Sequence, residues 1–126
     1  MKKILFVDKD DFYIKLYKKK LGEKIEFISA RDGEEAFKKI KEEKPDLVVT
    51  EILIPFKDGF KLIKETKKIK ELSGIPFIIL TTLNQEVDRK EGNRVAEGYF
   101  VKEEDSFSQV VEKMRELLGV EDKIIA

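Results

Sequence analysis

The chain of 126 residues contains no cysteine and no histidine. These absences exclude thiol nucleophiles, disulfide bonds, Cys/His zinc sites, Ser-His-Asp triads and acid–base catalysis by imidazole. An excess of either charge is missing as well, because 26 Lys and Arg residues balance 26 Asp and Glu residues. Binding to nucleic acid or to an anionic membrane needs an excess of cations, so we expect neither as a partner. The chemistry left to this chain belongs to carboxylates, lysines and hydroxyls.

Long hydrophobic runs are also missing. The apolar run near the N-terminus, Ile4 to Val7, ends at Asp8, which is typical of neither a signal peptide nor a membrane span. We therefore expect a cytoplasmic protein. The length and the 41% share of hydrophobic residues fit one globular domain, so residues 1–126 are expected to form a single domain.

Short apolar runs alternate with segments of helical periodicity along the chain. The runs that predict strands are 4–7, 25–28, 47–50, 77–80 and 98–101, and those at 4–7, 47–50 and 77–80 are typical of buried strands. Helices are predicted for 11–21, from about 33 through 40, after Gly59, within 84–96 and for 107–118. Gly92 and Asn93 are expected to interrupt the helix within 84–96. This alternation predicts the α/β class, with a parallel sheet covered on both faces.

Polar residues follow four of the five predicted strands. They are Asp8, Lys9 and Asp10 after the first strand, Glu51 after the third, Thr81 after the fourth and Lys102 after the fifth. Because the functional site of such a fold lies at the carboxyl ends of the strands, we expect these residues to converge in space. Carboxylates hold a divalent cation, and a hydroxyl and an ammonium neutralise phosphoryl oxygens. The set is therefore typical of a phosphoryl-transfer site.

Six motifs, in their order and spacing, resemble those of the receiver domain of two-component response regulators, of the single-domain chemotaxis type. They are Ile4–Asp8, Ala30–Ala36, Pro45–Thr50, Pro55–Leu62, Ile75–Thr81 and Gly98–Lys102, and the resemblance covers essentially the whole chain. The resemblance implies a flavodoxin-like (βα)5 fold, a doubly wound sheet of five parallel strands in the order 2-1-3-4-5. It also implies a signalling module rather than an enzyme, with no catalytic residues of its own.

In that family, a histidine kinase passes a phosphoryl group to an Asp after the third strand, and Mg²⁺ is held by this Asp and by an acidic pair after the first strand. Three positions of the present chain depart from this pattern: Glu51 at the phosphoacceptor, Lys9 at the second acid of the pair, and Glu103 where a proline usually follows the lysine. Three positions match the switch hydroxyl, the rotating aromatic residue and the lysine: Thr81, Tyr99 and Lys102.

The exchange of an acid for Lys9 opposes metal binding. Unit charges about 4 Å apart interact by roughly 4 kcal/mol near a protein surface. We expect the Lys9 ammonium to occupy the place of the cation and no metal or other cofactor to be needed; Mg²⁺, if bound, would be held by Asp8 and Glu51. Asp10 begins a predicted helix, so its expected role is that of an N-cap.

Glu51 is expected to remain unphosphorylated. Its extra methylene moves the carboxylate from the in-line geometry, and a misplacement of roughly 1 Å can cost ~10²-fold in rate. The longer side chain also brings Lys102 and Thr81 within reach. Two interpretations follow: Glu51 imitates a phosphorylated Asp and holds an active-like state, or Glu51, Lys9 and Lys102 form a fixed ion-pair network without switching.

The leading functional hypothesis is a stand-alone receiver without an output domain, which acts as a phosphorylation-independent protein-interaction module. The expected partner is another signalling protein, a histidine kinase or a downstream target, bound through the helix within 84–96, the strand 98–101 and the helix 107–118. Tyr99 would report the state to that partner, or would simply be packed. The alternative is a working phosphoacceptor receiver that takes a phosphoryl group from a histidine kinase with Mg²⁺, on Glu51 or Asp10.

Overall fold

A computed structural model describes residues 1–120 and shows one sheet of five parallel strands. The strands are β1 (Lys2–Val7), β2 (Ile25–Ala30), β3 (Leu47–Thr50), β4 (Phe77–Thr81) and β5 (Gly98–Val101). Their order is β2-β1-β3-β4-β5, which confirms the predicted doubly wound topology. Val7 pairs with Thr50, so the residues that follow them, Asp8 and Glu51, lie side by side. We call this end of the sheet the carboxyl edge.

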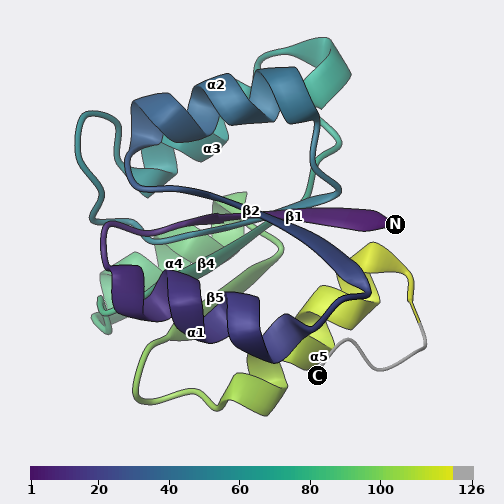
Figure 1. The fold of residues 1–126 in the computed structure, drawn as a ribbon. Coiled ribbons are helices and arrows are strands. Elements are labelled where there is room, and N and C mark those ends of the chain that lie inside the picture. Colours follow the sequence, from purple (N-terminus) through teal and green to yellow (C-terminus); the bar gives the residue numbers. More distant parts are fainter. Residues whose placement is uncertain (121–126) are drawn as a thin grey trace.

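Helices cover both faces of the sheet (Figure 1). Helices α1 (Asp11–Leu21) and α5 (Phe107–Leu118) pack on one face, and α2 (Gly33–Glu43) and α3 (Gly59–Lys67) pack on the other. A short 3-10 helix, η1 (Lys70–Leu72), follows α3, and α4 (Glu86–Val95) contacts α3 and β5. Across residues 1–120, none of these helices has the length and apolar character needed to cross a membrane.

The core consists of two apolar layers, one on each face of the sheet. Ile4 and Phe6 of β1 point into the layer beneath α1 and α5, whereas Leu5 and Val7 point into the layer beneath α2 and α3. Successive strand residues face opposite sides, so a strand covered on both faces needs apolar residues at every position. The same packing fixes the register of the strands and hence the positions of the polar residues at the carboxyl edge.

Polar side chains cap the starts of four helices. Asp10 accepts a hydrogen bond from the backbone N–H of Phe12 at 2.9 Å, which confirms its predicted role as the N-cap of α1. Asp32 and Asp58 cap α2 and α3 in the same way, and Ser106 caps α5. Each such cap satisfies a backbone donor that the helix leaves unpaired.

The predicted interruption of α4 at Gly92 and Asn93 is wrong. Helix α4 runs without a break from Glu86 to Val95, and Gly92 is buried within it. The ring of Tyr99 lies against Gly92, where a Cβ atom would overlap the Cδ2 and Cε2 atoms of the ring. A glycine inside a helix costs about 1 kcal/mol relative to alanine, and here it permits a close approach of an aromatic ring that no other residue would allow.

Candidate functional site

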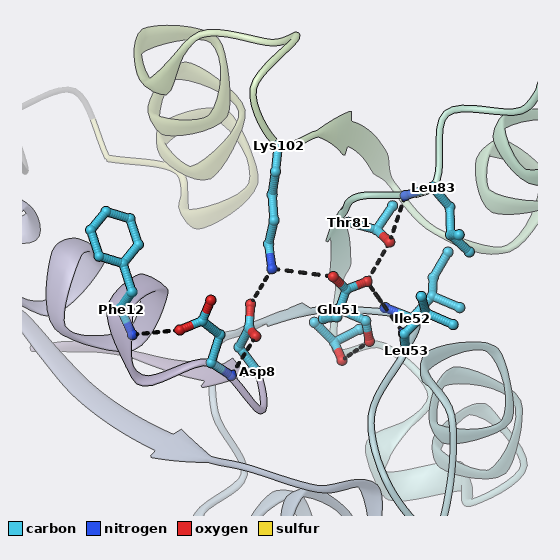
Figure 2. A network of polar contacts seen from close by, with 10 residues as sticks. Asp8, Phe12, Glu51, Ile52, Leu53, Thr81, Leu83 and Lys102 are labelled. Atoms are coloured by element: carbon cyan, nitrogen blue, oxygen red, sulfur yellow. Dashed lines mark hydrogen bonds and ion pairs between the residues drawn. The ribbon is translucent and has the colours of Figure 1, made fainter.

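Three charged side chains meet at the carboxyl edge and are almost fully buried (Figure 2). The Nζ atom of Lys102 lies 2.6 Å from Oδ2 of Asp8 and 3.1 Å from Oε1 of Glu51. The lysine comes from the end of β5, and the two acids come from the ends of β1 and β3. One ammonium therefore links two carboxylates that would otherwise repel each other in a buried place.

The second oxygen of Glu51 is satisfied by neutral donors. Oε2 accepts hydrogen bonds from the backbone N–H groups of Ile52 at 2.6 Å and Leu53 at 3.2 Å. It also accepts a hydrogen bond from the hydroxyl of Thr81. With Lys102 on Oε1, the carboxylate contacts four donors at once, as Figure 2 shows. This confirms the predicted reach of Glu51 to Lys102 and Thr81.

Tyr13 covers the Lys102 ammonium from the side of α1. The Nζ atom of Lys102 lies 4.0 Å from the centroid of the Tyr13 ring, a distance typical of a cation–π contact. The side chain of Lys102 is consequently only 3% exposed. Sequence reasoning did not assign Tyr13 to the site, although an aromatic residue in the first turn of the helix after Asp8 was a usable signal.

Lys9 does not join these residues, and its predicted place in the ion-pair network is wrong. Its side chain is exposed, and within residues 1–120 it makes no hydrogen bond or ion pair. The chain turns after β1, so that Asp8 points inward and accepts a hydrogen bond from the Asp10 N–H at 2.9 Å, while Lys9 points outward. An exposed ammonium keeps its hydration, which a buried one loses. Lys102, and not Lys9, supplies the ammonium between the carboxylates.

Burial and ion pairing act against each other on the charged groups of the site. Burial raises the pKa of Asp8, and the hydrogen bond from Lys102 lowers it by less. Burial alone would lower the pKa of Lys102, but its contacts with Asp8 and Glu51 outweigh burial and raise that pKa. Lys102 therefore carries its positive charge at neutral pH, as a fixed cation between the acids.

A chain of hydrogen bonds connects Glu51 with Tyr99, and we call it the Glu51–Tyr99 relay. The Thr81 hydroxyl donates to Glu51 and accepts a hydrogen bond from the backbone N–H of Leu83 at 3.2 Å. The carbonyl of Leu83 in turn accepts a hydrogen bond from the Tyr99 hydroxyl at 2.9 Å. Tyr99 points inward and is 8% exposed. The structure thus connects the two predicted switch positions, Thr81 and Tyr99, through the backbone of Leu83.

Comparison with known proteins identifies the fold family of this site. A family model of the response regulator receiver domain matches residues 4–115. The chain belongs to this family. Receiver domains are signalling modules that act with histidine kinases and downstream targets in two-component systems.

Two relatives and one solved structure illustrate the extent of the similarity. The chain is 36% identical over 104 residues to the chemotaxis protein CheY of Halobacterium salinarum, covering 80% of this chain and 84% of that protein. It is 36% identical over 103 residues to the alkaline phosphatase synthesis transcriptional regulatory protein PhoP of Bacillus subtilis; the match covers 80% of this chain but 42% of that protein. The Francisella response regulator 1452 receiver domain superposes with a TM-score of 0.85 at 26% identity, covering 94% of this chain and 98% of that one.

One solved receiver structure of the same fold contains a magnesium ion. The receiver domain of the sensor histidine kinase PA1611 of Pseudomonas aeruginosa, with a TM-score of 0.83 and 18% identity over 94% of this chain and 98% of that one, holds a magnesium ion in its active-site cleft. In the present receiver, the residues do not fit this ion. Residues 1–120 contain no group of three or more acidic side chains placed to hold a metal. The two carboxylates that face each other, those of Asp8 and Glu51, are both bonded to Lys102.

Proposed function

We propose that this receiver acts as a phosphorylation-independent protein-interaction module in two-component signalling. One observation carries the proposal: the carboxylate of Glu51 contacts Lys102, Thr81 and two backbone N–H groups at the same time. A hydroxyl, an ammonium and backbone N–H groups are the donors that neutralise phosphoryl oxygens. Glu51 therefore supplies, from its own side chain, the negative charge that a phosphoryl group would bring to these donors.

The contacts of Glu51 also oppose phosphorylation of its carboxylate. An oxygen that attacks a phosphoryl donor must first release its hydrogen bonds, and bonds to a charged group contribute about 1.5–3 kcal/mol each. Lys102 stands between Asp8 and Glu51, where a divalent cation would have to displace a buried ammonium. In this proposal, the Glu51 carboxylate is therefore not free to attack a phosphoryl donor, and the place between Asp8 and Glu51 is not free to bind a metal ion.

The contacts of Glu51 favour the first of the two interpretations, in which Glu51 imitates a phosphorylated Asp, because its carboxylate engages the hydroxyl and the ammonium that would neutralise phosphoryl oxygens. Tyr99 points inward and is joined to Glu51 through Thr81 and Leu83. The fixed network that includes Lys9 finds no support, because Lys9 is exposed. In this proposal the receiver acts in the cytoplasm. It presents α4, β5 and α5, the α4–β5–α5 face, to a histidine kinase or to a downstream target.

The proposal is tested by removing the Glu51 carboxylate and following Tyr99. The chain has three tyrosines and no tryptophan, so tyrosine labelled with ¹³C at Cζ gives few signals in an NMR spectrum. When no phosphoryl donor has been added, the Tyr99 signal of the unmodified protein should already be that of a buried ring. Glu51→Ala should shift this signal toward that of an exposed ring, and Lys9→Ala, the control, should leave it unchanged. A Tyr99 signal that is the same in all three proteins would contradict the proposal.

A further inference from the structure

Tyr99 is held at two points, its hydroxyl and the face of its ring. The hydroxyl donates to the Leu83 carbonyl, and the ring lies on Gly92 of α4. We call the space over Gly92 that the ring fills the Tyr99 seat. A Cβ atom at position 92 would overlap the ring, so the inward position of Tyr99 requires glycine there. Glycine is the poorest helix former after proline, so helix propensity does not explain its presence inside α4. The space that the Tyr99 ring needs does explain it.

Apart from Gly92, helix α4 packs on its neighbours through residues that are only partly buried, such as Val95. Its N-cap residue, Gln85, makes no side-chain hydrogen bond to the helix, unlike the caps of the other four α-helices, and Gly92 is its only fully buried residue. Two side chains from neighbouring elements tie it down: Lys67 donates to the Val95 carbonyl at 2.9 Å, and Glu104 pairs with Arg89. The contact between Gly92 and Tyr99 is therefore the main buried contact between this helix and the relay that begins at Glu51.

We propose that Gly92 is a positioning residue: it leaves space for the inward Tyr99 ring in the Tyr99 seat. Through this contact, the Glu51–Tyr99 relay affects the position of α4. Any side chain at position 92 would close the seat and turn the Tyr99 ring outward. The outward ring would change the α4–β5–α5 face while the contacts of Glu51 with Lys102 and Thr81 stayed in place. The inference deepens the proposed function and depends on it in one respect: the relay has a signalling role only if Glu51 sets the position of Tyr99.

A titration of the three tyrosines tests the Tyr99 seat directly. Burial raises the pKa of Tyr99 to about 12, whereas an exposed tyrosine titrates near pH 10. In Gly92→Ala, the titration of the Tyr99 ¹³Cζ signal should give a pKa at least one unit lower than in the unmodified protein. This corresponds to an acid dissociation constant that is roughly ten times larger. Asn93→Ala is the matched control, since it changes the adjacent and exposed position of the same helix. A Tyr99 titration in Gly92→Ala that equals that of the unmodified protein would overturn the inference.

A double-mutant cycle with Tyr99→Ala separates the seat from a general effect of the glycine on the helix. Without the ring, Gly92→Ala meets no obstacle and should raise the folding equilibrium constant about fivefold, as expected for glycine replaced by alanine in a helix. With the ring present, the same change should lower that constant or leave it unchanged. Equal stabilisation in both backgrounds would show that the ring does not occupy the seat and would overturn the inference.

The failure of this inference is distinguishable from failure of the proposed function. Glu51→Ala, measured by the same Tyr99 titration, reports only on the relay between Glu51 and Tyr99. A Tyr99 ring that stays inward in Glu51→Ala but turns outward in Gly92→Ala would contradict the proposed function and support the steric part of the inference. A ring that turns outward in Glu51→Ala but stays inward in Gly92→Ala would do the opposite.

Discussion

The carboxyl edge consists of two regions that differ in how their polar residues are used. In the region after β1, Asp8 alone points into the site, whereas Lys9 is exposed and Asp10 caps α1. In the region after β4 and β5, Thr81, Tyr99 and Lys102 are all buried and hydrogen-bonded. Within residues 1–120, the first region thus contributes one buried carboxylate, and the second contributes three buried polar side chains that are linked to Glu51 directly or through Leu83. This difference supports the proposed function, in which the receiver presents a state without being phosphorylated.

Removal of Lys102 should have the largest effect on stability. Lys102→Met leaves Asp8 and Glu51 buried and uncompensated, and breaking a buried ion pair by removing one partner costs about 3–5 kcal/mol. Chemical denaturation at neutral pH measures the change in the free energy of unfolding. Lys9→Met, in the exposed region, should change it by less than about 0.5 kcal/mol.

A triple variant serves as a second control for Lys102. Asp8→Asn and Glu51→Gln, combined with Lys102→Met, remove the charges together with the lysine and should recover about half of the loss. If Lys102→Met and Lys9→Met lowered the free energy of unfolding by equally small amounts, the two regions would not differ as described.

Restoration of the acids should create the metal site that the region after β1 lacks. Lys9→Asp combined with Glu51→Asp replaces an exposed cation next to Asp8 with a carboxylate and shortens the side chain at position 51, so Mg²⁺ affinity should rise about 10²-fold over that of the unmodified chain. Isothermal titration calorimetry measures it. Saturable Mg²⁺ binding by the unmodified protein, abolished by Asp8→Ala, would instead support the phosphoacceptor alternative.

Two adjacent threonines offer a matched test of the switch region. Thr81 donates to Glu51, whereas Thr82 is exposed and, within residues 1–120, makes no hydrogen bond. Thr81→Val should lower the free energy of unfolding by about 2 kcal/mol, as expected for a hydrogen bond to a charged group. Thr82→Val should change it by less than about 0.5 kcal/mol. Similar values for the two variants in urea denaturation would show that the Thr81 contact contributes little.

The smallest effect concerns the pH dependence of the Tyr99 contribution. Tyr99→Phe should cost about 1 kcal/mol at pH 8, where the hydroxyl bond to Leu83 is lost. Because burial raises the pKa of Tyr99 to about 12, its hydroxyl ionises first in the unfolded state, and its contribution to stability falls as pH rises from about 10 to 12. Two pKa units correspond to about 2.7 kcal/mol, which exceeds the contribution of the hydroxyl bond. The stability advantage of the unmodified protein over Tyr99→Phe should therefore vanish near pH 11, and Tyr99→Phe should be the more stable protein at pH 12 in denaturation experiments. An advantage of the unmodified protein that stays constant or grows from pH 10 to pH 12 would contradict the burial of Tyr99.

Much of the fold follows from local patterns in the sequence. The bounds predicted for β3, β5, α1 and α5 are those observed, because short apolar runs and clear caps such as Asp10 define them. The predicted interruption of α4 was wrong because of a tertiary contact. Glycine has a low helix propensity, and the contact of Gly92 with the Tyr99 ring cannot be inferred from the residues next to it in the sequence.

The site was predicted in part for similar reasons. Strand order places Asp8, Glu51 and Lys102 together, and the length of the Glu51 side chain predicts its reach to Thr81. The position of Lys9 after a strand does not tell whether its side chain turns inward, and the structure shows that it does not. The role of Leu83 in the relay comes from backbone atoms, which every residue has, so no residue type marks it in the sequence.

The most direct test of the central claim is intact-mass spectrometry after incubation with acetyl phosphate and Mg²⁺. The double variant with Asp at positions 9 and 51 is the positive control and should gain one phosphoryl group. The unmodified protein should keep its mass, with the ¹³Cζ signal of Tyr99 that of a buried ring before and after the incubation. A gain of one phosphoryl group on Glu51 of the unmodified protein would contradict the claim that its state is independent of phosphorylation.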